Sequence, residues 1–553
     1  MAYSIGIDFG TESGRVLLLD LETGEEKAAA SVSYKHGVIS KQLPETEAPL
    51  PPDFALQDPR DYIEVINAGI PQVLGQSGVN SQDVIGIGID FTSCTVLPVL
   101  SDGTPLCTLP EWSSHPHAWP KLWKHHAAQS YADRINDVAK KRNEDFITRY
   151  GGQISSEWYF PKLLEIFEND LSVYHATYAF VEAADWIVWY LTGNLKRNSC
   201  TAGFKALWSE GEGLPPDDFF REVNPNFIFP SEKLGVDFYP LGTRAGFLRE
   251  TIANTVGLTN KVAVAVGNID AHVSVPSVGV QSPGSMVLVM GTSTCHLTMT
   301  QNEVRLPGIT GVVKGGILPE LYGYEAGQAA VGDMFSWFVQ NGVPEEYHNH
   351  AKSEGISLYE YLENVATRLE PGETGLIAMD WWNGNRSIIG DANLSGMIFG
   401  LNLSTKPEEI YRTLLESTAF GTRVIVENFI NNGVEINELV ICGGIAVKSP
   451  LLMQLYADIC KLPITVKDST EIPARGAAMF GAVAAGSAAG GFASIQEASM
   501  RLNLPVLRKY APNSGDESIY ENLYQIYTKI YQYFGVDELS ILHNLKNIRL
   551  TIK

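Results

Sequence analysis

Short apolar runs that end in small polar residues recur along the chain and predict a series of β-strands. The runs 4–8 and 15–20 flank residues 9–14, Phe-Gly-Thr-Glu-Ser-Gly, which is the pattern of a β-hairpin. Another apolar run, 84–90, alternates glycine with isoleucine and stops at the small polar residues 92–95. These strands carry the first candidate functional residues at their ends.

The same strand–Gly-Thr–strand pattern returns in the second half of the chain. Residues 285–290 form an apolar run that leads into Gly291, Thr292 and Ser293, and residues 295–299 resume as a strand. The two patterns lie about 280 positions apart, whereas solenoid units repeat every 20–50 residues or so. The sequence therefore predicts a duplicated domain.

Helical periodicity separates the strands, so we expect an α/β protein. Helices are predicted over 119–137 and 183–191, the second followed by Gly193, which suits the left-handed turn after a helix. Apolar residues recur at helical spacing near the end of the chain. We expect an N-terminal domain at 1–265, a C-terminal domain at 266–510 and a helical tail at 511–553 that packs on the body.

Composition restricts the classes of partner. The 553 residues include 40 Lys and Arg against 63 Asp and Glu, a formal net charge of -23 at pH 7. Nucleic acids and anionic membranes require basic surfaces, so we expect neither as a partner. The six cysteines form no Cys-x-x-Cys pair, and no signal-like apolar segment opens the chain. Both features favour a cytoplasmic protein.

The two Gly-Thr segments are candidates for phosphate binding. Gly10 lets backbone N–H groups approach a phosphate closely, and Thr11 adds a hydroxyl oxygen. Asp8 is placed to hold Mg²⁺ through water, and Arg15 to face a phosphate. One such hairpin alone is more simply explained as a β-turn, but two at matching places favour a grip on a triphosphate. The chain has neither a Walker loop nor a Gly-x-Gly-x-x-Gly motif after a strand.

Asp270 is the candidate catalytic base. It follows the apolar run 262–266, and a carboxylate at the end of such a strand can accept a proton from an attacking hydroxyl. A helix N-cap explains an Asp at this place equally well. Gly443 and Gly444 follow a further strand and would let an adenine ring lie on the backbone. A plain strand–helix turn explains that pair more simply.

Together these motifs resemble the carbohydrate kinases named for a Phe-Gly-Gly-Tyr signature, over nearly the whole chain. The resemblance implies two duplicated RNase H-like domains of the actin/hexokinase-like ATPase fold, flanking a catalytic cleft for a sugar, ATP and Mg²⁺. The resemblance is also compatible with a homodimer. The motifs follow the order that the family has. The first phosphate loop would comprise Asp8, Gly10, Thr11, Ser13 and Arg15, and the catalytic base would be Asp270. The second phosphate loop would comprise Gly291, Thr292 and Ser293, and the adenosine region Gly443 and Gly444.

Three stretches, 201–208, 324–328 and 380–386, resemble the ribulokinase branch of this family. The resemblance implies ATP-dependent phosphorylation of a ketopentose, foremost L-ribulose to L-ribulose 5-phosphate in arabinose catabolism. Taken alone, a lysine such as that at 205 would be interpreted as a solvated surface residue. The resemblance instead implies that four side chains contact the ketopentose, namely Ser93, Lys205, Asp270 and Glu325.

The chain also departs from the family pattern. His125 and His126 stand in a segment where many relatives have Trp-x-Asp-x-Arg, and we interpret them as structural or pocket-lining. Glu165 replaces a tryptophan, and Ser93 with Cys94 stands where glycerol kinases carry Arg-Glu, which disfavours glycerol. The alternatives are a kinase for xylulose, D-ribulose, ribitol or glycerol, an actin- or chaperone-like ATPase switch, and a sugar-binding regulator without catalysis.

Overall fold

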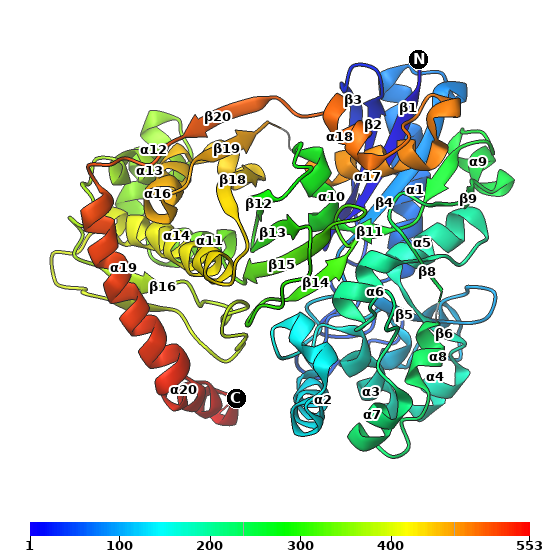
Figure 1. The fold of residues 1–553 in the computed structure, drawn as a ribbon, viewed down its shortest axis with the longest axis horizontal. Helices are drawn as coiled ribbons and strands as arrows, with labels where there is room; N and C mark the ends of the chain where they lie inside the picture. Colours follow the sequence, from blue (N-terminus) through cyan, green and yellow to red (C-terminus); the bar gives the residue numbers. More distant parts are fainter. Residues whose placement is uncertain (236, 469–470, 553) are drawn as a thin grey trace.

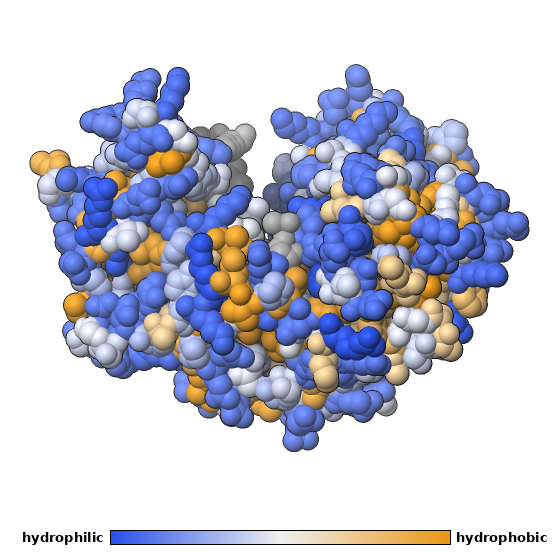
Figure 2. Space-filling view, turned by 90° about the horizontal axis from the view of Figure 1, so that it is seen from above, coloured by the Kyte–Doolittle hydropathy of each residue, from blue (hydrophilic) through white to orange (hydrophobic). Residues whose placement is uncertain are grey.

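The computed structural model describes residues 1–235, 237–468 and 471–552, which form two lobes, each built on a seven-stranded sheet (Figure 1). The first lobe contains strands β1–β4 and β9–β11, and the second contains β12–β15 and β18–β20. Seen from above, the surface is hollowed between the two lobes (Figure 2). None of the helices in the described ranges is both long and apolar enough to cross a membrane.

The first sheet begins with the predicted hairpin. Its order is β3-β2-β1-β4-β10-β9, with β11 beside β4; β1, β2 and β3 are antiparallel neighbours, while β1, β4 and β10 run parallel. All seven residues of β1 are buried, which explains its continuous apolar run. The strands are β1 Tyr3–Phe9, β2 Ser13–Asp20, β3 Glu26–Ser33, β4 Val84–Phe91, β9 Arg244–Phe247, β10 Ala263–Ala265 and β11 Asn268–Ile269.

The second sheet repeats this plan. Its order is β14-β15-β13-β12-β18-β19-β20; β12, β13 and β15 are antiparallel neighbours, while β12, β18 and β19 run parallel. The predicted duplication and the α/β class are therefore confirmed. The strands are β12 Gly284–Met290, β13 Thr294–Thr300, β14 Gly311–Lys314, β15 Tyr322–Gln328, β18 Ile436–Cys442, β19 Ile464–Lys467 and β20 Val506–Tyr510.

Helices and short strands cover the two sheets. The helices of the first lobe and its boundary are α1 Pro59–Ser77, α2 Gln129–Arg142, α3 Tyr159–Asn169, α4 Leu171–Ala176, α5 Ala183–Thr192, α6 Ser199–Lys205, α7 Asp217–Val223, α8 Pro230–Leu234, α9 Glu250–Val256 and α10 Asp270–Ser277. Those that follow are α11 Gly332–Asn341, α12 Glu345–Glu354, α13 Leu358–Ala366, α14 Pro407–Asn431, α15 Gly444–Lys448, α16 Pro450–Cys460, α17 Ile472–Ala485, α18 Ile495–Arg501, α19 Glu517–Gln532 and α20 Ser540–Ile552. The short strands are β5 Val96–Val99, β6 Ala179–Glu182, β7 Arg197–Asn198, β8 Phe238–Tyr239, β16 Ile377–Met379 and β17 Met397–Phe399.

The predicted helix over 119–137 is wrong in its first half. The helix α2 begins at Gln129, because the preceding segment contains Pro120 and pairs with a strand. The backbone N–H of Lys121 donates to the Val96 carbonyl at 2.8 Å, and Val96 N–H returns a bond to Lys121. The helix predicted over 183–191 is confirmed as α5, and Gly193 adopts the left-handed conformation after it.

Helix α19, which precedes the last helix α20, packs on α16 and on β16 of the second lobe. Tyr520, Tyr524 and Tyr527 are buried and face helix α14, where the guanidinium carbon of Arg423 lies 3.8 Å from the centre of the Tyr524 ring. The tail thus packs on the body mainly through tyrosines, whereas Ile526, one of the apolar residues at the predicted helical spacing, is exposed. The division at residues 265 and 266 falls between β10 and β11, and the domain ranges stay a prediction.

The helix α17 comes late in the chain but packs on β1 and β4 of the first lobe (Figure 1). Glycines make this approach close enough for backbone-to-backbone contact. A Cβ atom at Gly88 would lie 1.7 Å from the Ala477 carbonyl oxygen, and one at Gly6 would lie 1.7 Å from that of Ala474. The glycines that alternate with isoleucine in β4 thus bind the two halves of the chain together.

We expect Gly88→Ala to lower the free energy of unfolding by about 3 kcal/mol or more, because overpacking against backbone cannot relax easily. Gly75 offers a matched control, since it lies in helix α1 with nothing within 4 Å of a Cβ atom. Gly75→Ala should be neutral or stabilise the protein by about 0.5–1 kcal/mol. Urea denaturation of both variants measures the difference, and equal midpoints would contradict the packing account.

Candidate active site

Three aspartates lie at neighbouring strand ends of the first sheet. Asp8 in β1 and Asp90 in β4 are register partners, and β11 pairs with β4 at Asn268 opposite Asp90. Asp270 directly follows β11 and opens helix α10. Because parallel strands bring their carboxyl ends to the same edge of a sheet, the three carboxylates gather at one place.

Burial raises the pKa of each carboxyl group in this set, and the negative charge of Asp8 raises it further at Asp90 and Asp270. Burial, followed by the negative charge of Asp8, raises the pKa of Asp270 to about 7. Asp90 is fully buried, neither of its oxygens has a hydrogen-bond partner among the described residues, and burial with the charge of Asp8 raises its pKa well above 3.8. Burial also raises the pKa of Asp8, although Arg15 Nη1 lies 3.4 Å away and opposes it.

The structure forms both predicted Gly-Thr turns. In the first, Gly10 N–H donates to the Ser13 carbonyl at 3.0 Å, and in the second, Gly291 N–H donates to the Ser293 carbonyl at 2.9 Å. The Thr292 carbonyl accepts bonds from the N–H groups of 331 and 333, at the start of α11. Thr292 and Gly291 are exposed at the surface, so their outward groups are available to a ligand.

The predicted adenosine glycines lie beside the second turn. Gly443 has φ 106°, and a Cβ atom there would lie 2.1 Å from the carbonyl oxygen of Met290, the residue before Gly291. Only glycine fits that position. Gly444 opens helix α15, and nothing lies within 4 Å of a Cβ atom built on it. Its open side is where a flat ring could lie; adenine binding stays a prediction.

Lys205 and Glu325 are not surface residues but a buried pair that joins the two lobes. Lys205 Nζ donates to Glu325 Oε1 at 2.9 Å and to Oε2 at 2.8 Å, and both residues are nearly inaccessible. His272 Nε2 lies 3.2 Å from the same carboxylate, while its Nδ1 lies 3.1 Å from Cys200 Sγ. Burial alone would raise the pKa of Glu325, but Lys205 and His272 hold it well below its usual range. Because His272 and Asp270 share the first turn of α10, the pair lies close to the candidate base, and its charges act on the pKa of Asp270.

Ser93 lies in a loop that a buried lysine holds in place. Cys94 adopts φ 58°, and its carbonyl accepts a hydrogen bond of 2.6 Å from Lys162 Nζ, which also bonds the carbonyl of Leu122. Lys162 is fully inaccessible. Its ammonium therefore fixes the backbone around Ser93, the predicted sugar contact of this loop.

Two departures from the family pattern, His125 and Glu165, form a buried cluster beside this loop, whereas His126 is exposed. Glu165 accepts from His125 Nε2 at 2.9 Å and pairs with Lys121 at 3.2 Å. Burial would raise the pKa of Glu165, but Lys121 and His125 hold it well below its usual range. His126 Nδ1 lies 3.5 Å from Ser156 Oγ. Glu165 thus stands in place of a tryptophan and is paired with the Lys121 ammonium, while burial lowers the pKa of His125 to about 3 and leaves it a neutral hydrogen-bond partner.

Sequence reasoning missed three residues of this site. Asp90 ends an apolar strand as Asp8 does, and that shared position was the available signal. Trp123 Nε1 donates to Thr11 Oγ1 at 3.2 Å and so touches the first phosphate turn. His272 follows Asp270 by two positions and holds Glu325. No local pattern indicates the last two contacts, because each joins segments more than 50 residues apart.

The aspartates fit a magnesium ion that is shared with a substrate. Within the described ranges, no three His, Cys, Asp or Glu side chains form a metal site by themselves. Magnesium keeps several waters and is usually held by one or two carboxylates together with substrate phosphates. Asp8 and Asp90, register partners of which Asp90 has buried and unpartnered oxygens, have the donor chemistry for this mode.

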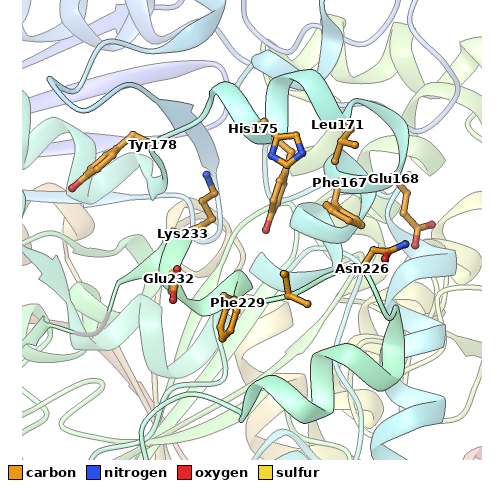
Figure 3. Close-up of a pocket in the computed structure, with 11 residues that line it drawn as sticks. Phe167, Glu168, Leu171, His175, Tyr178, Asn226, Phe229, Glu232 and Lys233 are labelled. Carbon is orange, nitrogen blue, oxygen red and sulfur yellow. The ribbon is translucent and has the colours of Figure 1, made fainter.

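A pocket of about 750 Å³ lies elsewhere on the first lobe (Figure 3). Phe167, Tyr174, Tyr178 and Phe229 give it aromatic walls, and Lys233 and Glu232 lie among them. None of the predicted site residues lines it. This pocket is therefore separate from the candidate active site at the three aspartates.

Family models match most of the chain, and relatives match it over nearly its full length. The N-terminal domain of the FGGY family of carbohydrate kinases matches residues 3–275, and its C-terminal domain matches residues 286–485. A protein named ribulokinase from Anoxybacillus flavithermus is 51% identical over 552 residues, covering 100% of this chain and 98% of its own. A ribulokinase from Mycolicibacterium smegmatis is 46% identical over 535 residues, covering 96% and 94%.

Solved structures share the fold at low identity. A xylulose kinase from Lactobacillus acidophilus has a TM-score of 0.78 at 18% identity and covers 97% of this chain and 99% of its own. A gluconate kinase from the same organism has a TM-score of 0.76 at 19% identity and covers 97% and 98%. The similarity extends over both lobes, and at this identity it concerns the fold alone.

Proposed function

Because the chain belongs to the FGGY family of carbohydrate kinases, we propose that it transfers the γ-phosphate of ATP to a ketopentose and that L-ribulose is its substrate. The observation that carries the choice of sugar is the identity of about 50% over the whole chain to several proteins named ribulokinase. The structure supports it with the buried pair Lys205 and Glu325 beside Asp270.

Asp270 is the proposed base of the reaction. The terminal hydroxyl oxygen of the sugar forms a bond to the γ-phosphorus, the bond from that phosphorus to the bridging oxygen of ADP breaks, and the Asp270 carboxylate takes the hydroxyl proton. An aspartate of ordinary pKa would be a weaker base at neutral pH. Burial and the charge of Asp8 raise its pKa to about 7, which suits proton transfer near neutrality.

The two Gly-Thr turns are proposed to bind the phosphates. Gly10 and Thr11 come from the first lobe, Gly291 and Thr292 from the second, so a triphosphate bound by both turns would join the lobes. Magnesium bound near Asp8 would neutralise phosphate charge, which is most of what phosphoryl transfer requires besides positioning. Arg15, which pairs with Asp8 at 3.4 Å, adds a cation at the first turn.

Lys205 and Glu325 are proposed to orient the sugar together with Ser93. A lysine offers three donors and a carboxylate about four acceptor sites, so the pair retains capacity for sugar hydroxyls after bonding each other. Because Lys205 belongs to the first lobe and Glu325 to the second, sugar binding by the pair would depend on the relative position of the two lobes. The cytoplasmic location and the homodimer stay predictions, and the six cysteines, all of them free thiols, suit a reducing compartment.

We expect the pH profile of kcat/KM to report Asp270. Only the carboxylate form accepts a proton, so kcat/KM for L-ribulose should fall about tenfold per unit as the pH drops below about 7. The ordinary pKa of 3.8 would place this fall far lower. Initial rates between about pH 5 and 9 measure the midpoint. A profile that stays flat down to pH 5 would assign the base role to another group.

Sugar-dependent ADP release tests the proposal against an ATPase switch. The kinase proposal predicts slow ATP turnover alone and a strong rise with L-ribulose, and it predicts that both require Mg²⁺. Water must be excluded from the bound triphosphate until the sugar binds, or ATP would be hydrolysed without product. Equal turnover with and without sugar would favour a switch.

A further inference from the structure

Arg386 is a cationic side chain of the second lobe that has no role in the site described so far. It lies between β16 and β17, and its neighbour Ser387 accepts a hydrogen bond of 3.1 Å from the N–H of Gly327 in β15. A Cβ atom at Gly327 would lie 3.0 Å from Arg386 Cδ and 3.5 Å from its Nη1. The arginine therefore runs along the backbone of β15, two residues from Glu325.

The surroundings of Arg386 connect to both phosphate turns through neighbouring residues. On one side, the same Cβ position at Gly327 is 3.0 Å from the carbonyl oxygen of Thr294, the residue directly after the second turn. On the other side, the guanidinium carbon lies 5.9 Å from the centre of the Trp123 ring, and Trp123 donates to Thr11 of the first turn. Arg386 is therefore one residue removed from the first turn, through Trp123, and lies along the strand that pairs with the residue after the second turn.

The charged residues of the proposed sugar site also lie around Cys295, which is next to Arg386. Burial, followed by the negative charge of Glu325, raises the pKa of the Cys295 thiol to about 12, and the charges of Arg386, Asp270 and Lys205 also act on that thiol. Cys295 is the register partner of Gly327. Arg386 thus shares one neighbourhood with the candidate base and the sugar pair.

The protein uses only part of the hydrogen-bonding capacity of Arg386. Its Nη2 lies 3.5 Å from Glu157 Oε2 of the first lobe, longer than the 2.7–2.9 Å or so of a charge-assisted hydrogen bond. Other pairs already join the lobes, such as Arg305 with Asp145 at 2.6 Å. The contact with Glu157 is therefore not needed as a latch, and the five N–H donors of the guanidinium leave capacity for a ligand.

We infer that Arg386 contacts the transferring phosphoryl group and stabilises the charge on its equatorial oxygens, an inference that rests on the proposed kinase function. In the step, the bond from the sugar oxygen to the γ-phosphorus forms as the bond to the ADP oxygen breaks, and the proton passes to Asp270. The forked guanidinium matches two phosphoryl oxygens, which a lysine cannot do. Arg386 approaches from the second lobe, whereas Asp8 and Asp270 approach from the first.

The test is Arg386→Ala in the full-length enzyme, with native turnover of L-ribulose measured first. We expect kcat to fall about 100-fold or more. Calorimetric affinity for L-ribulose should stay within about threefold, since the contact forms only with the phosphoryl group. Affinity for L-ribulose 5-phosphate should fall about tenfold or more, because the product keeps that group. Arg386→Lys should recover part of the rate.

Arg305→Ala is the matched control, because it removes another arginine that bridges the lobes outside the site. It should keep native kcat and product affinity. If Arg386→Ala weakens L-ribulose binding but keeps kcat, Arg386 is a sugar ligand and the inference is wrong. If both arginine variants lose the same activity, Arg386 acts as a latch and the inference is also wrong. A native enzyme that phosphorylates no ketopentose would instead refute the proposed function.

Discussion

Asp270→Asn is expected to lower kcat about 10²–10⁴-fold while leaving the fold and ATP binding intact. Asparagine keeps the shape of the side chain and its bond from the Ala271 N–H, which Asp270 Oδ1 accepts at 2.7 Å. It cannot take the proton of the sugar hydroxyl. The substitution also removes a buried charge from beside Asp8, so the variant should be at least as stable as the native protein.

Single-turnover kinetics and ATP calorimetry together isolate this loss. The same variant should abolish the fall in kcat/KM below about pH 7, because that fall belongs to the Asp270 carboxyl group. The structure places the N-cap of α10 at Ile269 and Asp270 inside the helix, so native-like turnover in Asp270→Asn would leave its carboxylate only the bond to the Ala271 N–H at the helix start. Because phosphoryl transfer passes through a loose transition state, part of the loss in kcat would come from a misoriented sugar hydroxyl and not from the missing base.

Lys205→Ala is expected to lower kcat/KM for L-ribulose about 100-fold or more, with ATP affinity nearly unchanged. The lysine is buried against Glu325, so its loss leaves an uncompensated carboxylate and should also lower the free energy of unfolding by about 3–5 kcal/mol. Glu325→Ala should behave in the same way. Both variants affect the sugar rather than the phosphate turns, which lie on other elements.

A double variant separates sugar binding from stability. Lys205→Met with Glu325→Leu removes both charges and replaces them with apolar groups, so it should regain much of the lost stability, as buried ion pairs often do when replaced together. It should not regain L-ribulose turnover. Recovery of activity along with stability would mean that the pair only holds the lobes together and that the sugar is bound elsewhere.

The sequence predicted the elements of the site better than their neighbours. The two Gly-Thr hairpins and the strand before Asp270 follow from local hydrophobic patterns, and the structure forms them as β1–β2, β12–β13 and β10. The carboxylate of Asp90 was not singled out, because its role depends on β4 lying beside β1 in register with Asp8. Hydrophobic periodicity specifies strands but not which strands pair.

Long-range contacts account for the other gaps. Lys205 and Glu325 were linked to the sugar only through resemblance, and their bond to each other spans 120 positions. Helix α17 crosses to the first lobe because glycines in β1 and β4 admit its backbone, a cause that single-strand patterns do not reveal. The helix predicted over 119–137 failed where Lys121 gained a strand partner, since tertiary pairing overrides local propensity.

The measurement that tests the central proposal most directly is kcat/KM of the native enzyme for a panel of sugars. A coupled assay of ADP release at saturating Mg²⁺-ATP gives the rates. The panel comprises L-ribulose, D-ribulose, xylulose, ribitol and glycerol. We predict that L-ribulose gives the highest value and that the polyols, which lack the ketone, give far lower ones. Glycerol as the best substrate, or no rise in ADP release with any ketopentose, would contradict the assignment.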